Sequence, residues 1–526
     1  MVCSVVARGV LGEREGGERR RPTRAFGSHG RTARHAREER DERGISHHQN
    51  NIMTLPAKMD QVVVVERKPE DATATTTEPV TPVSHKSAKP NGMKVELSPL
   101  ASRPKNRIRI FVEGLLQSAR REGEPDSKTG EPLPKRLDLS LGDPTALGLA
   151  PPAEAEDAVV SAVKDGLMTT KQVHGYQHSC GSPAFREAIC EEISPGVSPD
   201  SVFVTSGCSQ ALQFALTALA KEGSNVLVPN PCFPLYNTIC EHVGAEARSY
   251  SLLPERGWEA CLRDLDAKLD DNTCCLLVCN PGNPTSHSYS QDHLCDLLRF
   301  AYDKRIPVVA DEVYAHMTYD PRADERSTFQ WMADVASQQL GRNRPPVLSC
   351  SALSKRFLVP GWRCGWLALH DDAGRSLVQA GISNGIAALC QIGMTTNSMA
   401  QAAAPLVLRN TPQSYHDSLN ETMRKGAAYC LERISKCEGL ECPSEPSGAM
   451  YMFFRVPEAR GHADGEGGDS SDVVFCRDLL SEKNVFTLPG FLFGSPNFVR
   501  VVSAAPMAVL EEAWDRIEDF CKGRSD

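Results

Sequence analysis

The chain has 526 residues, of which 40% are apolar, and a formal net charge of −9. This length allows two or three domains, and the composition is typical of a soluble globular protein. The acidic balance argues against nucleic acid as the main partner, and no apolar stretch is long enough to span a membrane. The 19 cysteines are scattered without paired spacing, so we expect neither a disulfide framework nor a metal site.

The first 50 residues hold eleven Arg against seven Asp or Glu residues. An Arg-rich start is compatible with an organelle (mitochondrial or plastid) transit segment, but such segments are poor in acidic residues and this one is not. It also lacks the apolar core of a secretory signal. We therefore expect residues 1–95 to be a disordered leader and linker, with Met53 as a second start, on a cytoplasmic protein. Organelle targeting stays open as the alternative.

Ordered structure is expected to begin near Asn106. From there, short apolar runs alternate with segments of helical spacing, such as residues 211–220. Repeated strand, loop and helix units predict an α/β domain with a mainly parallel sheet covered by helices on both faces. In such sheets, ligands bind at the loops that follow the strands. The expected strands are 202–205, 225–229, 274–279, 306–310, 347–350 and 364–369.

The pattern changes after about residue 410. A long amphipathic helix is expected over 421–436, and a last helix is expected from Leu510. Strand-like runs at 450–454 and 498–502 lie between them. This alternation indicates a second, smaller α+β domain that the stretch around 106–145 joins. We expect an N-terminal part of the small domain at 104–150, a large domain at 151–408 and a C-terminal part of the small domain at 409–526.

Four polar residues follow expected strands: Asn283, Asp311, Tyr314 and Lys355. Together they are the groups that an enzyme needs to hold pyridoxal phosphate. Lys355 would bind the aldehyde and move a proton at the substrate Cα, Asp311 would pair with the ring nitrogen, and Tyr314 and Asn283 would donate to the ring oxygen. Taken singly, each has a structural alternative: a surface lysine, a helix cap, a core tyrosine and a turn asparagine.

A phosphate site is expected where Gly207, Cys208 and Ser209 open a helix, because backbone N–H groups at a helix N-terminus bind anions. Arg363 would add a charge-assisted hydrogen bond to the phosphate. Phe233 would stack on the cofactor ring, with core packing as the alternative. A Ser-Gly turn that only caps a helix would look the same in the sequence.

Arg500 lies inside the apolar strand pattern of residues 498–502. Arginine is rarely buried without a partner. A bidentate contact with the α-carboxylate of a substrate would explain this position. A structural salt bridge is the alternative.

With these residues in place, the chain from about residue 104 to the C-terminus resembles the fold-type I aminotransferases. Within them it is similar to the tyrosine aminotransferase group, which includes the nicotianamine aminotransferases. The Lys355 string carries most of the resemblance, and the Gly142 and Arg500 strings place the chain near this group. The strings are Leu139-Ser-Leu-Gly-Asp-Pro-Thr145, Thr205-Ser-Gly-Cys-Ser-Gln210, Ala310-Asp-Glu-Val-Tyr314, Leu353-Ser-Lys-Arg-Phe-Leu-Val-Pro-Gly-Trp-Arg363, Pro446-Ser-Gly-Ala-Met-Tyr451 and Asn497-Phe-Val-Arg-Val-Val502.

The resemblance implies further roles. Gly142 and Asn283 would bind the substrate carboxylate together with Arg500. Tyr176 would reach the phosphate of the neighbouring subunit, which implies a homodimer with shared active sites, and residues 151–408 would be the cofactor-binding domain. The partners would be an amino acid and a 2-oxo acid, with no nucleic acid and no membrane. Ser354 is expected near the phosphate.

Two positions depart from the family pattern. Ser286 and His287 follow Asn-Pro-Thr, where relatives usually have glycine first. Ala352 stands where some relatives have a phosphate-binding serine, so Ser354 or Ser351 would substitute. We expect the first departure to alter the loop near the cofactor ring without removing an assigned side chain.

The resemblance predicts transamination of tyrosine, and of other aromatic amino acids, with 2-oxoglutarate, giving 4-hydroxyphenylpyruvate and glutamate in amino acid catabolism. A pyridoxal phosphate-dependent carbon–sulfur lyase, or an aminotransferase of other donor preference, would share every cofactor residue. A non-catalytic regulator is a third interpretation, but it would need a DNA-binding module, and the leader shows no helix-turn-helix pattern.

Overall fold

The computed structural model describes residues 97–118, 122–125, 130, 132–169, 172–193, 197–320, 329–458 and 469–524. All of them belong to one compact unit, which extends from Gly92 to the C-terminus. The expected leader and linker at 1–95, and Met53 within it, lie outside the described residues.

The described part of the chain contains an eight-stranded sheet in the order β2-β9-β8-β7-β6-β3-β4-β5. The five central strands, β8-β7-β6-β3-β4, run parallel to one another. The strand β9 is antiparallel to both β2 and β8, and the short β5 is antiparallel to β4. The predicted α/β class with a mainly parallel sheet is confirmed, and all six expected strands occur. They are β2 (Val202–Thr205), β3 (Asn225–Asn230), β6 (Thr273–Cys279), β7 (Val308–Asp311), β8 (Val347–Ala352) and β9 (Gly365–His370), joined by β4 (Glu246–Leu253) and β5 (Glu259–Ala260).

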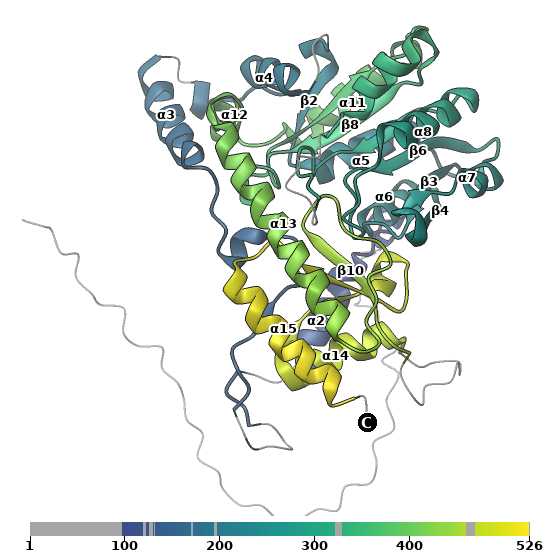
Figure 1. Ribbon diagram of the computed structural model, residues 1–526. Helices are drawn as coiled ribbons and strands as arrows, with labels where there is room; N and C mark the ends of the chain where they lie inside the picture. The colour runs from purple at the N-terminus through teal and green to yellow at the C-terminus, as the bar shows by residue number, and fades with distance from the viewer. Residues whose placement is uncertain are drawn as a thin grey trace, which may run out of the picture. The chain divides into compact units, whose positions relative to one another are not determined.

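Side chains of the central strands alternate between two apolar layers, as the period of a strand requires. Val226 and Val228 pack on one face of the sheet, and Leu227 between them packs on the other. Because both faces are buried, β3, β6, β7 and β8 carry mostly apolar side chains. One face is covered by α5 (Cys208–Leu219), α6 (Leu235–Val243) and α11 (Ile382–Gly393), and the other by α7 (Leu262–Lys268), α8 (Gln291–Asp303) and α9 (Met332–Val335) (Figure 1).

A third apolar cluster covers the end of the sheet at β2 and β9, where Val204 and Trp366 meet three helices. These are α3 (Ala153–Thr169), α4 (Pro183–Ile193) and α12 (Ser398–Asn410), and α12 packs against both of the others. Two one-turn helices, α1 (Pro99–Ser102) and α10 (Ser376–Gln379), lie elsewhere on this unit.

A smaller sheet has β13 (Phe498–Val502) at its centre, antiparallel to β10 (Tyr451–Arg455) and β12 (Leu488–Pro489). Its core includes residues of α13 (Gln413–Lys436), α14 (Ser471–Lys483) and α15 (Met507–Lys522). Figure 1 shows α13 and α15 side by side, and the two helices are in contact. The expected α+β elements after residue 410 are therefore present.

The N-terminal segment joins this smaller region. Its strand β1 (Leu137–Asp138) pairs in parallel with β11 (Val485–Phe486), and α2 (Arg107–Ser118) packs apolar side chains against the loop around β12. Both C-terminal helices begin earlier than the apolar spacing predicted, α13 at Gln413 rather than Glu421 and α15 at Met507 rather than Leu510. In each case a proline stands immediately before the first helical residue, a position where its missing N–H costs nothing.

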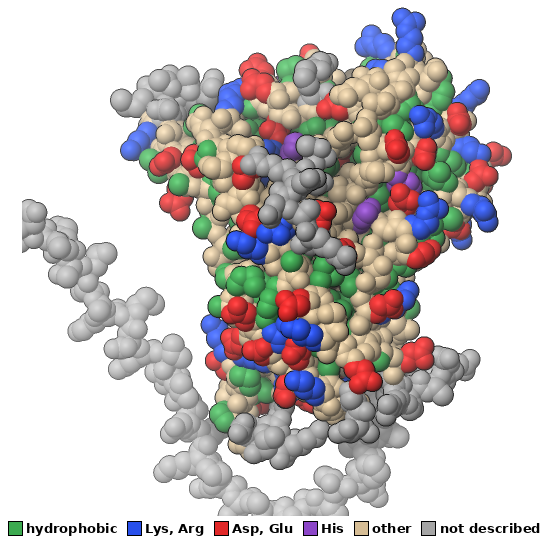
Figure 2. Space-filling view, viewed as in Figure 1, with side chains coloured by type: hydrophobic (Ala, Val, Ile, Leu, Met, Phe, Trp, Pro, Cys, Tyr) green, Lys and Arg blue, Asp and Glu red, His purple; other side chains and the backbone are tan. Residues whose placement is uncertain are grey.

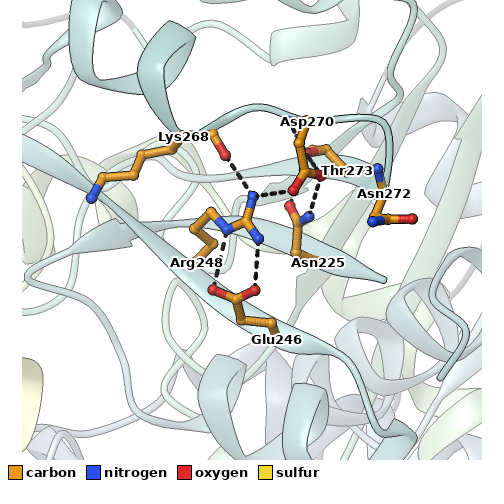
Figure 3. Close-up of polar contacts among 7 residues, drawn as sticks. All are labelled: Asn225, Glu246, Arg248, Lys268, Asp270, Asn272 and Thr273. Carbon is orange, nitrogen blue, oxygen red and sulfur yellow. Dashed lines mark hydrogen bonds and ion pairs between the residues drawn. The ribbon is translucent and has the colours of Figure 1, made fainter. Parts of the chain in front are cut away.

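The amino edge of the large sheet, opposite the loops that follow the parallel strands, holds a structural ion-pair network (Figure 3). Arg248 contacts both carboxylate oxygens of Glu246, at 3.1 and 2.7 Å, and donates to Asp270 at 2.7 Å and to the carbonyl of Lys268 at 2.9 Å. Asp270 also accepts from Asn225 at 2.7 Å, and these partners lower its pKa to about 2. The charged side chains of this network therefore pair with one another.

Charged side chains of both signs are intermixed along the outer surface of α13 and α15 (Figure 2). They form ion pairs within and between the helices, such as Lys436 with Glu432 at 2.6 Å and Arg433 with Asp515 at 2.7 Å. Such a surface is typical of the solvated face of amphipathic helices. Among the helices of the described residues, none combines the length and apolar character needed to cross a membrane.

Candidate active site

A cavity of about 640 Å³ lies where the loops after the parallel strands meet the smaller sheet and α2. Its position agrees with the rule that ligands bind beyond the carboxyl ends of parallel strands. Eleven of the thirteen residues that the sequence analysis assigned to a site line this cavity: Gly142, Cys208, Ser209, Phe233, Asn283, Asp311, Tyr314, Ser354, Lys355, Arg363 and Arg500. The other two are Gly207 and Tyr176. Gly207 lies against the guanidinium of Arg363, and Tyr176 is exposed.

Asp311 is the last residue of β7 and is buried. Its carboxylate accepts hydrogen bonds from the hydroxyl of Tyr236 at 2.6 Å, the thiol of Cys208 at 3.4 Å and the backbone N–H of Val313 at 3.3 Å. All three donors are neutral, and burial raises the pKa of Asp311. A buried carboxylate in these surroundings is stabilised by a cation placed beside it.

Lys355 follows β8, and its Nζ donates a hydrogen bond to the carbonyl of Gly142. A Cβ on Gly142 would lie 2.2 Å from the hydroxyl oxygen of Tyr451, so any larger residue there would displace the buried Tyr451 side chain. Ser354 is buried and also lines the cavity, whereas the hydroxyl of Ser351 donates to the carbonyl of Glu312 at 2.9 Å. Of the two serines considered as substitutes for Ala352, Ser354 is the one that faces the cavity.

The N-terminus of α5 forms a cradle with Arg363. Gly207, the residue before the helix, has φ 75° and ψ 173° and provides no side-chain cap, which leaves the first N–H groups of the helix available. A Cβ on Gly207 would lie 2.6 Å from a guanidinium nitrogen of Arg363, and one on Gly365 would lie 2.7 Å from the carbonyl carbon of Gly207. Arg363 donates to the carbonyls of Ser206 at 3.0 Å and Pro360 at 3.1 Å. The guanidinium of Arg363 and the free N–H groups at the start of α5 therefore lie close together, an arrangement that suits an anion.

Arg500 lies at the centre of β13 and is only 4% exposed. It donates to the side-chain oxygen of Asn283 at 2.9 Å and to the carbonyl of Ser140 at 2.6 Å, while its Nε has no partner. Its guanidinium carbon lies 4.3 Å from the ring centroid of Tyr451. Burial lowers the pKa of Arg500. Among the described residues, no carboxylate forms an ion pair with Arg500. The structure therefore does not support the alternative of a structural salt bridge.

Three contributors to the site were not assigned from the sequence: Tyr236, Tyr451 and Ser140. The hydroxyl of Tyr451 lies 2.7 Å from that of Tyr314, and both tyrosines are buried. Burial raises the pKa of Tyr314. Tyr236 lies on α6, three positions after Phe233, and their rings meet edge to face with centroids 6.0 Å apart. The strings that carried the family resemblance contain Tyr451 and Ser140, but nothing local to them indicates a contact with distant residues.

The donor set fits a cofactor with an aldehyde, an aromatic ring nitrogen and a phosphate. The cavity offers a lysine, a buried carboxylate with only neutral donors, hydroxyl groups, and a guanidinium beside a helix N-terminus. Each of these groups suits one part of pyridoxal phosphate.

A sequence profile described as aminotransferase class I and II matches residues 134–517. The chain belongs to this family. This aminotransferase is 35% identical over 402 residues to the tyrosine aminotransferase of Mus musculus, covering 76% of this chain and 84% of that protein. It is 32% identical over 392 residues to nicotianamine aminotransferase B of Hordeum vulgare, covering 73% of this chain and 67% of that protein.

The solved structure of the tyrosine aminotransferase from Leishmania infantum superposes on this aminotransferase with a TM-score of 0.67 and 28% identity, covering 82% of this chain and 99% of that one. The predicted resemblance and the predicted fold are therefore confirmed, and the protein is an aminotransferase enzyme. Fold-type I aminotransferases depend on pyridoxal phosphate, use amino acids and 2-oxo acids as substrates, and are typically dimeric.

Proposed function

We propose that this aminotransferase transfers the amino group of tyrosine, and of other aromatic amino acids, to 2-oxoglutarate, giving 4-hydroxyphenylpyruvate and glutamate. The observation that carries this proposal is Arg500, a buried guanidinium that faces the cavity with neutral partners only. A substrate carboxylate would supply the missing negative charge through bidentate hydrogen bonds. The relatives named tyrosine aminotransferase support tyrosine as the donor.

The walls of the cavity support an aromatic donor. Apolar side chains of α2 and of the smaller sheet, including Ile108, Val112 and Leu488, line it together with Leu141. An aromatic ring buries more apolar area in such surroundings than a short polar side chain does. Gly142 and Asn283 would bind the carboxylate alongside Arg500, because all three line the same cavity.

Pyridoxal phosphate would supply the electron sink that makes the bond between the substrate Cα and its hydrogen labile. Lys355 would hold the aldehyde and then move the proton at Cα, because it lines the cavity and its Nζ lies beside Gly142, where the substrate carboxylate is proposed to bind. Asp311 would pair with the protonated ring nitrogen, and Tyr314 and Asn283 would donate to the ring oxygen. Phe233 would stack on the ring.

The phosphate would be bound by the backbone of Gly207, Cys208 and Ser209 at the start of α5, with Arg363 and Ser354 adding hydrogen bonds. The enzyme would be a homodimer in which Tyr176 reaches the phosphate of the neighbouring subunit. In one protomer this tyrosine is 95% exposed, so its side chain is available to contact another subunit.

The assay is direct. The purified protein loaded with pyridoxal phosphate is incubated with tyrosine and 2-oxoglutarate, and both 4-hydroxyphenylpyruvate and glutamate are quantified. Formation of the two products in equal amounts supports the proposal. Release of ammonia and pyruvate from a cysteine conjugate without transamination identifies a carbon–sulfur lyase instead, and faster turnover of alanine or methionine identifies another donor preference.

A further inference from the structure

Ser286 occupies a junction between the two sheets. It lies in the loop after β6, three positions beyond Asn283, and is fully buried with φ 52°. A left-handed backbone at a serine costs free energy that glycine would not incur. Opposite it, Ala449 has φ 53° and is also fully buried. Strained non-glycine residues of this kind persist where the surrounding structure holds them.

Four hydrogen bonds hold Ser286. Its N–H donates to the carbonyl of Gly282 at 3.0 Å, and its carbonyl accepts from the N–H groups of Ser447 at 2.8 Å and Gly448 at 3.0 Å. These three contacts need no side chain. The fourth does: the hydroxyl oxygen of Ser286 accepts from the backbone N–H of Tyr451 at 3.0 Å. A glycine at this position would leave that buried N–H without this acceptor.

Tyr451 connects this hydrogen bond to the site. Its hydroxyl lies 2.7 Å from that of Tyr314, and its ring faces Arg500. The same hydroxyl lies so close to Gly142 that a Cβ there would be 2.2 Å away. A small displacement of Tyr451 therefore moves the groups proposed to hold the substrate carboxylate and the ring oxygen of the cofactor.

We propose that Ser286 is a positioning residue of this aminotransferase: by accepting from the Tyr451 N–H, its hydroxyl fixes Tyr451 and thereby the geometry of Arg500. The inference rests on the proposed role of Arg500 in binding the substrate carboxylate. It assigns a function to the position where this chain departs from the glycine that is usual in its relatives.

The test compares Ser286→Gly with the native holoenzyme. Glycine tolerates φ 52°, which offsets the cost of the lost hydrogen bond to the Tyr451 N–H, so the melting temperature should stay close to the native value. The dissociation constant for 3-(4-hydroxyphenyl)propionate, a carboxylate without an amine, should rise roughly tenfold, as should KM for both the amino donor and 2-oxoglutarate. The pH at which the absorbance of the bound cofactor changes should also shift, because Tyr314 shares its hydroxyl contact with Tyr451.

Ser290→Ala is the matched control. Ser290 lies in the same loop and its hydroxyl also accepts from a backbone N–H, that of His293 at 3.2 Å, but it caps α8 and points to no site residue. This variant should lower the melting temperature and leave the dissociation constant and KM unchanged. The double variant Ser286→Gly with Tyr451→Phe tests whether both changes act through the Tyr451 side chain. If they do, the fold-increase in its dissociation constant for the propionate should be smaller than the product of the fold-increases of the two single variants.

The inference is overturned if Ser286→Gly binds the propionate within twofold of the native enzyme, or if it only lowers the melting temperature as Ser290→Ala does. Arg500→Ala, measured in parallel, separates the positioning role from the carboxylate site. If Arg500→Ala weakens binding and Ser286→Gly does not, only the positioning role fails. If Arg500→Ala leaves binding unchanged, the proposed carboxylate site fails and the role of Ser286 fails with it.

Discussion

The guanidinium carbon of Arg500 lies 4.3 Å from the ring centroid of Tyr451. A guanidinium over an aromatic face is stabilised by the electrons of the ring. The ring of Phe493 lies 4.7 Å from the same carbon, so two aromatic side chains hold the cation. The arrangement keeps a buried arginine in place while its partners remain neutral.

Replacing Arg500 with alanine should weaken the binding of both substrates, because amino and oxo acids share the α-carboxylate. Removing one partner of a desolvated charged pair costs roughly 2–5 kcal/mol, which should appear mainly as a higher KM. Steady-state kinetics with tyrosine and 2-oxoglutarate measure this. Arg455→Ala is the control, since Arg455 ends β10, is exposed and pairs with Glu441 at 2.9 Å. An unchanged KM for Arg500→Ala would contradict its assignment.

Lys355→Ala should abolish turnover and the covalent attachment of the cofactor. Borohydride reduction followed by peptide mass mapping should label native protein at Lys355 and leave the variant unlabelled. Lys304→Ala, a change at an exposed lysine paired with Asp266 at 2.5 Å, should retain both label and turnover. A label on another lysine in the native enzyme would refute the assignment.

Asp311→Asn should preserve the fold and reduce kcat by about 10²-fold or more, the size of effect seen when one electrostatic contact to developing charge is lost. Asparagine keeps an acceptor for the Tyr236 hydroxyl but cannot stabilise a protonated ring nitrogen. The absorbance of the bound cofactor reports the change independently of turnover. Asp270→Asn, in the network at the opposite edge of the sheet, should leave kcat unchanged. Equal kcat values for Asp311→Asn and native enzyme would exclude the proposed pairing.

Gly207→Ala should weaken cofactor binding, because its Cβ would lie 2.6 Å from the Arg363 guanidinium and its φ of 75° disfavours alanine. A loss of about 1–3 kcal/mol in cofactor affinity is expected, measured by equilibrium dialysis with pyridoxal phosphate. Gly361→Ala is a close control: this glycine is two residues from Arg363, and a Cβ there meets nothing within 4 Å. Similar affinities for the two variants would argue against the cradle.

The stability of the protein should depend on His370 at mildly acidic pH. Burial, followed by the charge of Arg344, lowers the pKa of His370 to about 4, and its Nε2 has no hydrogen-bond partner. The unfolded chain takes up a proton near pH 6.5, whereas the folded chain resists protonation until about pH 4. The free energy of unfolding is therefore highest above pH 6.5, where His370 is neutral in both states. It decreases by at most about 3 kcal/mol as the pH falls from 6.5 towards 4, because only the unfolded chain binds the proton there.

Urea unfolding of native protein and His370→Gln at pH 7.5, 6 and 5 checks this. Glutamine does not titrate, so the difference in unfolding free energy between the two proteins should change in favour of the variant as the pH falls. His174→Gln, at an exposed histidine, serves as the control. A difference that stays constant across this range would contradict the prediction.

Most of the secondary structure of the large sheet could be predicted because each strand carries its own signal. The runs at β3, β6 and β7 are buried on both faces, so each contains a continuous apolar segment. β8 is also buried, although it includes Ser349 and Ser351. The starts of α13 and α15 could not be predicted. The first turn of α13 is mostly polar, and that of α15 is a continuous apolar run, Met507-Ala-Val-Leu510, which has no helical spacing of its own. Local spacing detects an amphipathic segment and misses a first turn that is polar or apolar throughout.

The sequence by itself determined which residues are the candidates for chemistry at the strand ends, because Lys355 and Asp311 each follow an apolar run and such positions meet at one edge of a parallel sheet. Only the tertiary structure decided their partners. Tyr236 reaches Asp311 across 75 residues, and Arg500 reaches Asn283 across 217. A strand signal depends on neighbouring residues, whereas a hydrogen bond between distant segments depends on how the two sheets come together, and no local pattern encodes that.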